Sequence, residues 1–149
     1  MNKRLIKLYE IGEGEGVRFW NAYLPHEDGA TFRKAGLTVI YISVRLGERE
    51  EYVVLAHEMG HYFTDCATAF SVPVSKLIDE ARADAWKAAY LVPYDKYIQA
   101  MRSTFVLNDW EAAEELGVDI ESIVRAREKY RAQGLPVSQS ELGCVYREP

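Results

Sequence analysis

The residues best suited to chemistry form a short run in the middle of the chain, His57-Glu58-Met59-Gly60-His61. In an α-helix, residues four apart differ by about 40° in direction and about 6 Å in height, so both imidazoles project from one face. Two imidazoles placed in this way can each approach one zinc ion to about 2.0–2.1 Å. Glu58, one step round the helix, can address a water on that ion, which is the general-base position of a zinc hydrolase.

A catalytic zinc site uses three protein ligands and one open position for water, so a third ligand must come from elsewhere in the chain. The candidates are His26, a cysteine or a carboxylate, because the chain has three histidines in all. The best-placed carboxylate is Glu80 on the next expected helix, where Asp84 shares its face. Asp84 can accept the second N–H of a ligand histidine and fix its tautomer. The predicted site therefore consists of two histidines, a carboxylate ligand, a general base and an orienting carboxylate: His57, His61, Glu80, Glu58 and Asp84.

Other interpretations of the potentially reactive residues carry less weight. A chance His-Glu-x-x-His in a chain of this length is a matter of roughly one in a few hundred, which disfavours core histidines that bind no metal. A structural zinc site would close its fourth position with Cys or His, and none is placed to do so. His26 is expected in a surface loop, and Cys66 is expected to be a small buried residue instead of a competing ligand. One of the tyrosines could steady the oxyanion of a tetrahedral intermediate, but the sequence does not single one out.

The composition limits the class of protein. The chain has 149 residues, 48% of them apolar and 28% charged, which fits one compact domain. Lys7 and Glu10 interrupt any signal-peptide core, and no apolar run approaches the roughly 20 residues that span a bilayer. Two cysteines are too few for a disulfide scaffold, so we expect reduced thiols and a cytoplasmic protein. The net charge of −5 disfavours direct nucleic-acid binding.

The elements that must position the site are predicted to be a small sheet and several helices, an α+β arrangement. Periodicity and turn residues predict a helix at residues 3–11, strands at 17–23 and 37–43, and a loop at 25–36 between them. The histidines fall on a mostly buried helix at 50–63, and Glu80 falls on an alanine-rich helix at 75–91 that can approach a neighbour closely.

The second half of the chain is predicted to be helical. A helical stretch runs from residue 94 to about 105, Asn108 caps a short helix that Gly117 ends, and Asp119 caps a last helix that Gly134 ends. We expect a single metallopeptidase domain over residues 1–149. Its parts would be a catalytic core at about 1–100, a helical hairpin at about 101–134, and a partly ordered tail at 135–149.

Two stretches of the sequence resemble one known family. His57-Glu-Met-Gly-His61, followed by Glu80-Ala-Arg-Ala83-Asp84-Ala-Trp86-Lys-Ala-Ala-Tyr90-Leu91-Val92-Pro93, is similar to the ImmA/IrrE zinc metallopeptidases. The corresponding stretch of that family is roughly Glu-x-x-Ala-Asn-x-Phe-Ala-x-x-Leu-Leu-Met-Pro. Residues 36–42 and 113–118 also resemble the family, so the likeness covers about residues 16–132. It implies a minimal zincin-like fold of the gluzincin kind, a cytoplasmic endopeptidase, and cleavage of a helix-turn-helix transcriptional repressor.

The chain departs from the family pattern most clearly at Lys87. This lysine replaces a small residue one turn after Asp84 and two turns after Glu80. Its ammonium could pair with either carboxylate and weaken the donation of that carboxylate to zinc. Alternatively, its stem lies along the helix and its head reaches water. We favour the second arrangement, which leaves the site active.

Two functions from other classes remain as alternatives. The segment 109–128 has the spacing of a DNA-binding helix-turn-helix, but its would-be recognition helix begins Asp119-Ile-Glu-Ser122. Carboxylates there would face the phosphates and base edges, so we expect a helical hairpin that packs on the core or receives the substrate. The other alternative is a catalytically silent regulator, which would keep the metal and bind a partner protein without turnover.

Overall fold

The computed structural model describes residues 2–64, 73–103, 106 and 108–145. The chain forms two compact units, Met1–Lys87 and Ala88–Pro149. The class is α+β, with a three-stranded sheet and helices, and the minimal zincin-like fold that the sequence predicted is confirmed. The single domain expected over residues 1–149 stays a prediction. Within the described parts of the chain, every helix is too short or too polar to cross a bilayer.

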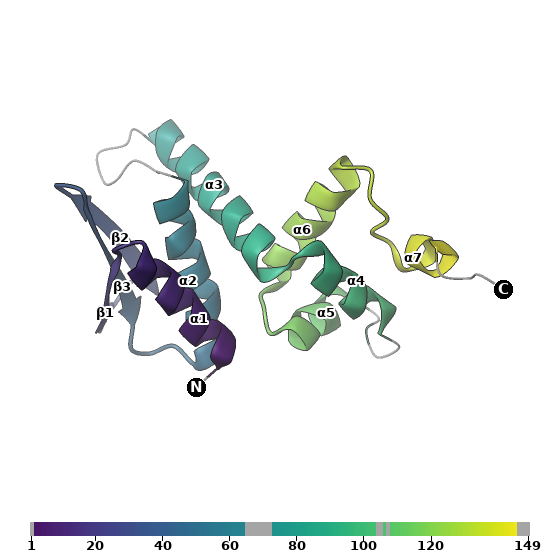
Figure 1. Ribbon diagram of the computed structural model, residues 1–149, viewed down its shortest axis with the longest axis horizontal. Helices are drawn as coiled ribbons and strands as arrows, with labels where there is room; N and C mark the ends of the chain where they lie inside the picture. The colour runs from purple at the N-terminus through teal and green to yellow at the C-terminus, as the bar shows by residue number, and fades with distance from the viewer. Residues whose placement is uncertain (1, 65–72, 104–105, 107, 146–149) are drawn as a thin grey trace. The chain divides into compact units, whose positions relative to one another are not determined.

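The first unit is built around the sheet. Its elements, in chain order, are α1 (Lys3–Gly14), β1 (Arg18–Ala22), β2 (Gly29–Lys34), β3 (Leu37–Ser43), α2 (Glu48–Phe63) and the start of α3 (Pro73–Leu91). The strand order is β1-β3-β2, with β1 parallel and β2 antiparallel to the central β3. Helices α1 and α2 lie on one face of the sheet (Figure 1). The apolar residues between these layers, which are essentially inaccessible to solvent, are Leu5, Leu8, Ile40, Ile42, Leu55 and Met59.

Strand β2 lies where the sequence predicted a loop, so that part of the prediction was wrong. The strand pairs with β3 from Gly29↔Ile42 to Lys34↔Leu37. Ala35 and Gly36 alone connect the two strands, and both have positive φ, 51° and 77°. A two-residue turn of this kind matches the twist of paired strands, but it is most often recognised by Asn-Gly or Asp-Gly. Ala-Gly gives a weaker signal, so the hairpin was missed.

The second unit is helical. It contains the end of α3 and then α4 (Tyr94–Arg102), α5 (Asp109–Leu116), α6 (Ile120–Ala132) and α7 (Gln139–Val145). The Asn108 side chain accepts a hydrogen bond from the backbone N–H of Glu111, and Gly117 ends α5 in the left-handed conformation, as predicted. Helix α7 occupies the segment that was expected to be a tail. The Gln139 amide fixes its start by donating to the carbonyl oxygens of Met101 and Val106, at 3.2 and 2.7 Å.

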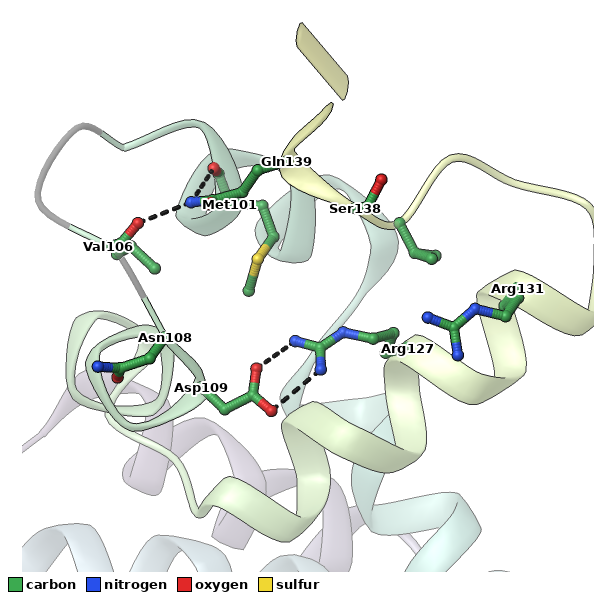
Figure 2. A pocket seen from close by; sticks show the side chains of 9 residues that line it. Met101, Val106, Asn108, Asp109, Arg127, Arg131, Ser138 and Gln139 are labelled. Atoms are coloured by element: carbon green, nitrogen blue, oxygen red, sulfur yellow. Dashed lines mark hydrogen bonds and ion pairs between the residues drawn. The ribbon is translucent and has the colours of Figure 1, made fainter. Parts of the chain in front are cut away.

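The second unit contains a hollow with a volume of about 270 Å³ (Figure 2). The ion pair between Asp109 and Arg127 lies in its lining. There the Arg127 guanidinium donates to both carboxylate oxygens of Asp109, and its Nε donates to the Tyr97 hydroxyl at 2.9 Å. The Gln139 amide on its rim is likewise engaged with backbone carbonyls. Three of the polar residues around the hollow, Asp109, Arg127 and Gln139, therefore join α4, α5, α6 and α7.

Candidate metal centre

The two histidines lie on the side of α2 that faces away from the sheet, where 21% of the His57 side chain and 16% of the His61 side chain are exposed. The opposite side of this helix is buried through Tyr52, Leu55 and Met59, which anchors its backbone against the sheet. The rings of His57 and His61 meet edge to face with their centroids 4.8 Å apart. Their Nε2 atoms are 3.1 Å apart. The one-turn spacing therefore brings both imidazoles to one point, as the sequence predicted.

Helix α3 approaches α2 closely because of a glycine. A Cβ atom on Gly60 would lie 2.6 Å from the carbonyl oxygen of Ala83 and 3.0 Å from its Cα. Both are backbone atoms, which cannot move aside without moving the helix. Ala83 itself is completely buried. This contact places Glu80, one turn earlier on α3, beside the two histidines. The predicted close approach through alanine is confirmed at Ala83, whereas the contribution of Gly60 to this contact was not predicted.

The three donor groups fit one metal ion. The His57 Nε2 atom lies 3.0 Å from Glu80 Oε2, and the His61 Nε2 atom lies 3.1 Å from Glu80 Oε1. Donor atoms of all three side chains lie within 4.8 Å of one another. Two donors bound tetrahedrally to zinc at about 2.0–2.1 Å are about 3.3 Å apart, close to these separations. Two imidazoles and one carboxylate are also a donor set that zinc accepts in catalytic sites.

Asp84 sits behind His57, on the side away from Glu80. Its Oδ1 lies 2.8 Å from the Nδ1 atom of His57. An ionised carboxylate can only accept, so this contact suits an Nδ1–H donor, and with that tautomer the Nε2 lone pair would be free for a metal ion shared with Glu80 and His61. A ligand histidine needs this tautomer, and the arrangement is the one that the sequence predicted for Asp84.

Lys87 is placed differently from our expectation. Its side chain is buried, with 7% of its surface exposed, and its Nζ lies 3.7 Å from Asp84 Oδ1. The prediction that its head reaches water was therefore wrong. An ammonium can be held inside a protein only where an opposite charge offsets its loss of hydration, and the Asp84 carboxylate supplies that charge. Helical spacing did not show that this face of α3 is covered.

Glu58 is a buried carboxylate next to the donor cluster. Only 6% of the residue is exposed, and its Oε2 accepts a 2.6 Å hydrogen bond from the Thr31 hydroxyl of β2. A Cβ on Gly29 would come within 2.9 Å of the Glu58 Cγ, so the glycine leaves room for this side chain. Burial raises the pKa of Glu58, while the Thr31 hydrogen bond and the two imidazoles lower it and Glu80 raises it.

A carboxylate whose pKa is raised is suited to accept a proton near neutral pH. Thr31 and Gly29 were both missed in the sequence, because each belongs to the strand that was taken for a loop. His26 is exposed between β1 and β2, in agreement with the predicted surface position. Cys66 lies outside the described residues.

The chain matches the Peptidase_M78 family, described as the IrrE N-terminal-like domain, over residues 13–127. The matched span includes the whole sheet, α2 and α3, and therefore every residue of the cluster. The chain belongs to this family. The resemblance to the ImmA/IrrE proteins is thereby confirmed. A comparison with curated proteins finds no match. Membership of Peptidase_M78 points to a metallopeptidase, and the His57, His61 and Glu80 group points to a metal cofactor.

Proposed function

We propose that this protein is a zinc-dependent endopeptidase of the cytoplasm, with His57, His61 and Glu80 as zinc ligands and Glu58 as general base. The observation that carries the proposal is the convergence of two imidazole nitrogens and a carboxylate at 3.0–3.1 Å beside a buried glutamate. A zinc ion held there would act as a Lewis acid on the scissile carbonyl and lower the pKa of a water molecule.

The protein's own groups divide the remaining work. Glu58 takes the proton of the attacking water and passes it to the leaving amine, which is general base and then general acid catalysis. The Thr31 hydroxyl holds one oxygen of Glu58 and so fixes the orientation of the carboxylate. Asp84 holds the Nδ1 side of the His57 ring, which would leave the Nε2 lone pair free for the metal.

Strand β2 offers a way to hold an extended substrate beside Glu58. In the described sheet it lies at an edge, with β3 as its paired neighbour. An edge strand has free N–H and C=O groups that can pair with an added peptide strand. Because Thr31 of β2 contacts Glu58, a substrate segment along this edge would run next to the general base. The substrate must therefore present an exposed or locally unfolded stretch.

The test of catalysis is Glu58→Gln. The amide cannot accept a proton from water, so this variant should keep its fold and its metal but lose peptide hydrolysis. Glu50→Gln is a matched control on the same helix. Glu50 hydrogen-bonds the Gly47 N–H at the start of α2, a role that glutamine also fills. The control should retain full activity, and wild-type cleavage rates in Glu58→Gln would remove Glu58 from the mechanism.

The substrate that we propose is a helix-turn-helix transcriptional repressor, on the basis of the resemblance to the ImmA/IrrE proteins. The net charge of −5 would favour encounter with a basic DNA-binding domain. Residues 109–121 form an acidic stretch, but it adds little to this attraction. Its Asp109 is paired with Arg127, and its Glu121 with Arg125, so neither offers a free charge to a partner.

The test of the substrate is incubation of the purified enzyme with the repressor encoded beside it, followed by mass spectrometry of the products. Cleavage at one or a few bonds, absent with Glu58→Gln, is the expected result. The alternative function is a catalytically silent regulator. That alternative would be favoured if the wild type and Glu58→Gln both bound the repressor tightly. The zinc-loaded wild type would then show no cleavage, with or without an inducing signal.

A further inference from the structure

The side chain of Lys87 is buried, which is unusual for a lysine. Lysine is rarely buried without a partner, because the charge loses its hydration. In this protein the side chain lies in the first unit with 7% of its surface exposed, and Nζ is 3.7 Å from a carboxylate oxygen of Asp84. A small residue at this position would avoid the cost of burial altogether. The charge is therefore placed where it acts on Asp84.

The contact falls on a particular oxygen of Asp84. The Oδ1 atom that faces Lys87 Nζ is the same atom that accepts from His57 Nδ1 at 2.8 Å. Because one oxygen serves both contacts, a partial rotation of the carboxylate away from this orientation would lengthen both together. Lys87 and His57 thus hold one orientation of Asp84 from two sides.

The charges around the site support a role for this lysine when a metal is bound. Among the described residues, three side chains have carboxylates near the donor cluster: Glu58, Glu80 and Asp84. A divalent cation would offset two of these charges, and the Lys87 ammonium would offset the third. Because the ammonium is paired with Asp84, it acts at the metal as part of a dipole and not as a lone repelling charge.

We propose that Lys87 is a positioning residue of the metal centre. By holding Asp84, it keeps the Nδ1 proton of His57 engaged and the Nε2 lone pair directed toward the ion. This inference rests on the proposed function, since it takes His57 as a metal ligand. The family pattern has a small residue at this position, so the proposed role would be a consequence of the lysine that this chain has instead.

The first test measures zinc affinity by competition with a chromogenic chelator, which does not depend on enzyme activity. Lys87→Met should weaken zinc binding about tenfold, at the lower end of losses seen when a partner of a ligand is removed. Lys87→Arg keeps the charge and should stay within about threefold of wild type. Lys76→Met is the matched control, because Lys76 lies on the same helix and is exposed. Its zinc affinity should equal that of wild type.

The second test asks whether Lys87 acts through Asp84. In an Asp84→Asn background, Lys87→Met should no longer weaken zinc binding, since the lysine has no carboxylate left to hold there and its unpaired charge would only repel the cation. Nitrogen-15 NMR of the His57 imidazole should show the Nδ1–H tautomer in wild type and a mixture in Lys87→Met. Circular dichroism checks the fold, and Lys87→Gln replaces Lys87→Met if the latter does not fold.

Three outcomes would overturn the inference. They are unchanged zinc affinity in Lys87→Met, tighter binding in Lys87→Met, or a tenfold loss that persists in the Asp84→Asn background. Failure of the proposed function is seen separately in His57→Ala. If that variant keeps its zinc, the metal site itself is misassigned. If it loses zinc while Lys87→Met does not, only the role of Lys87 falls.

Discussion

At the scale of single residues, two opposing effects act on the pKa of Glu58. Burial raises its pKa, and the hydrogen bond from the Thr31 hydroxyl lowers it by stabilising the charged form. The base must be deprotonated to act, so the pKa of Glu58 sets the acidic limb of the pH dependence of kcat/KM. The second-largest influence on that pKa comes from a residue of β2.

Thr31→Val removes this hydroxyl while keeping a β-branched side chain. Without its hydrogen bond the pKa of Glu58 rises further, so the acidic limb of kcat/KM should move to higher pH. Thr31→Ser keeps a hydroxyl and should leave the limb where it is in wild type. The measurement is a pH profile of peptide hydrolysis for the three proteins. An acidic limb at the same pH in Thr31→Val and wild type would contradict the assignment of that limb to Glu58.

At the scale of elements, local sequence patterns sufficed for the two helices that carry the donors. The His57 and His61 spacing and the shared face of Glu80 and Asp84 are properties of one helix each. What local patterns could not give is how elements meet. The hairpin of β2 depends on an Ala35-Gly36 turn with a weak signature, and the burial of Lys87 depends on what packs over α3.

The contact between α2 and α3 yields a prediction about Gly60. Within a helix, Gly→Ala is normally stabilising by about 1 kcal/mol. At this position the new methyl group would meet the backbone of Ala83, so Gly60→Ala should instead destabilise the protein, by about 1–3 kcal/mol, and weaken zinc binding by pushing Glu80 away. Chemical denaturation and chelator competition measure the two effects.

Gly14→Ala is the matched control for this change. Gly14 lies in α1, and a methyl group added there would have no atom of a neighbouring element within 4 Å. This variant should be as stable as wild type or more stable, with unchanged zinc affinity. Equal behaviour of Gly60→Ala and Gly14→Ala would show that the close helix approach does not position the ligands.

At the scale of the whole molecule, the second unit depends on the ion pair between Asp109 and Arg127. The hydrogen bonds from Arg127 hold the pKa of Asp109 below its ordinary value of 3.8. A depressed carboxyl pKa adds stability above the unfolded-state value, and this stability is lost as the pH falls through the native value. The contribution of the pair is therefore complete well above pH 3.8 and declines below it.

Asp109→Asn tests this dependence. The variant should be less stable than wild type by about 1 kcal/mol near neutral pH, and the difference should shrink as the pH falls below about 4. Hydrogen exchange of the α6 amides, with a chelator present to remove any metal contribution, follows the second unit. Glu121→Gln is the control, because its partner Arg125 lies on the same exposed helix face. A difference between wild type and Asp109→Asn that is independent of pH would contradict the account.

The central claim is that His57, His61 and Glu80 hold one catalytic zinc ion. The most direct measurement is the metal content of protein purified without added zinc, determined by elemental mass spectrometry for wild type, His57→Ala and Glu80→Ala. Wild type should contain about one zinc per chain, and each variant should contain far less, because two remaining donors bind the ion weakly. Full retention of zinc in Glu80→Ala would contradict the claim and would show that the third ligand is another residue.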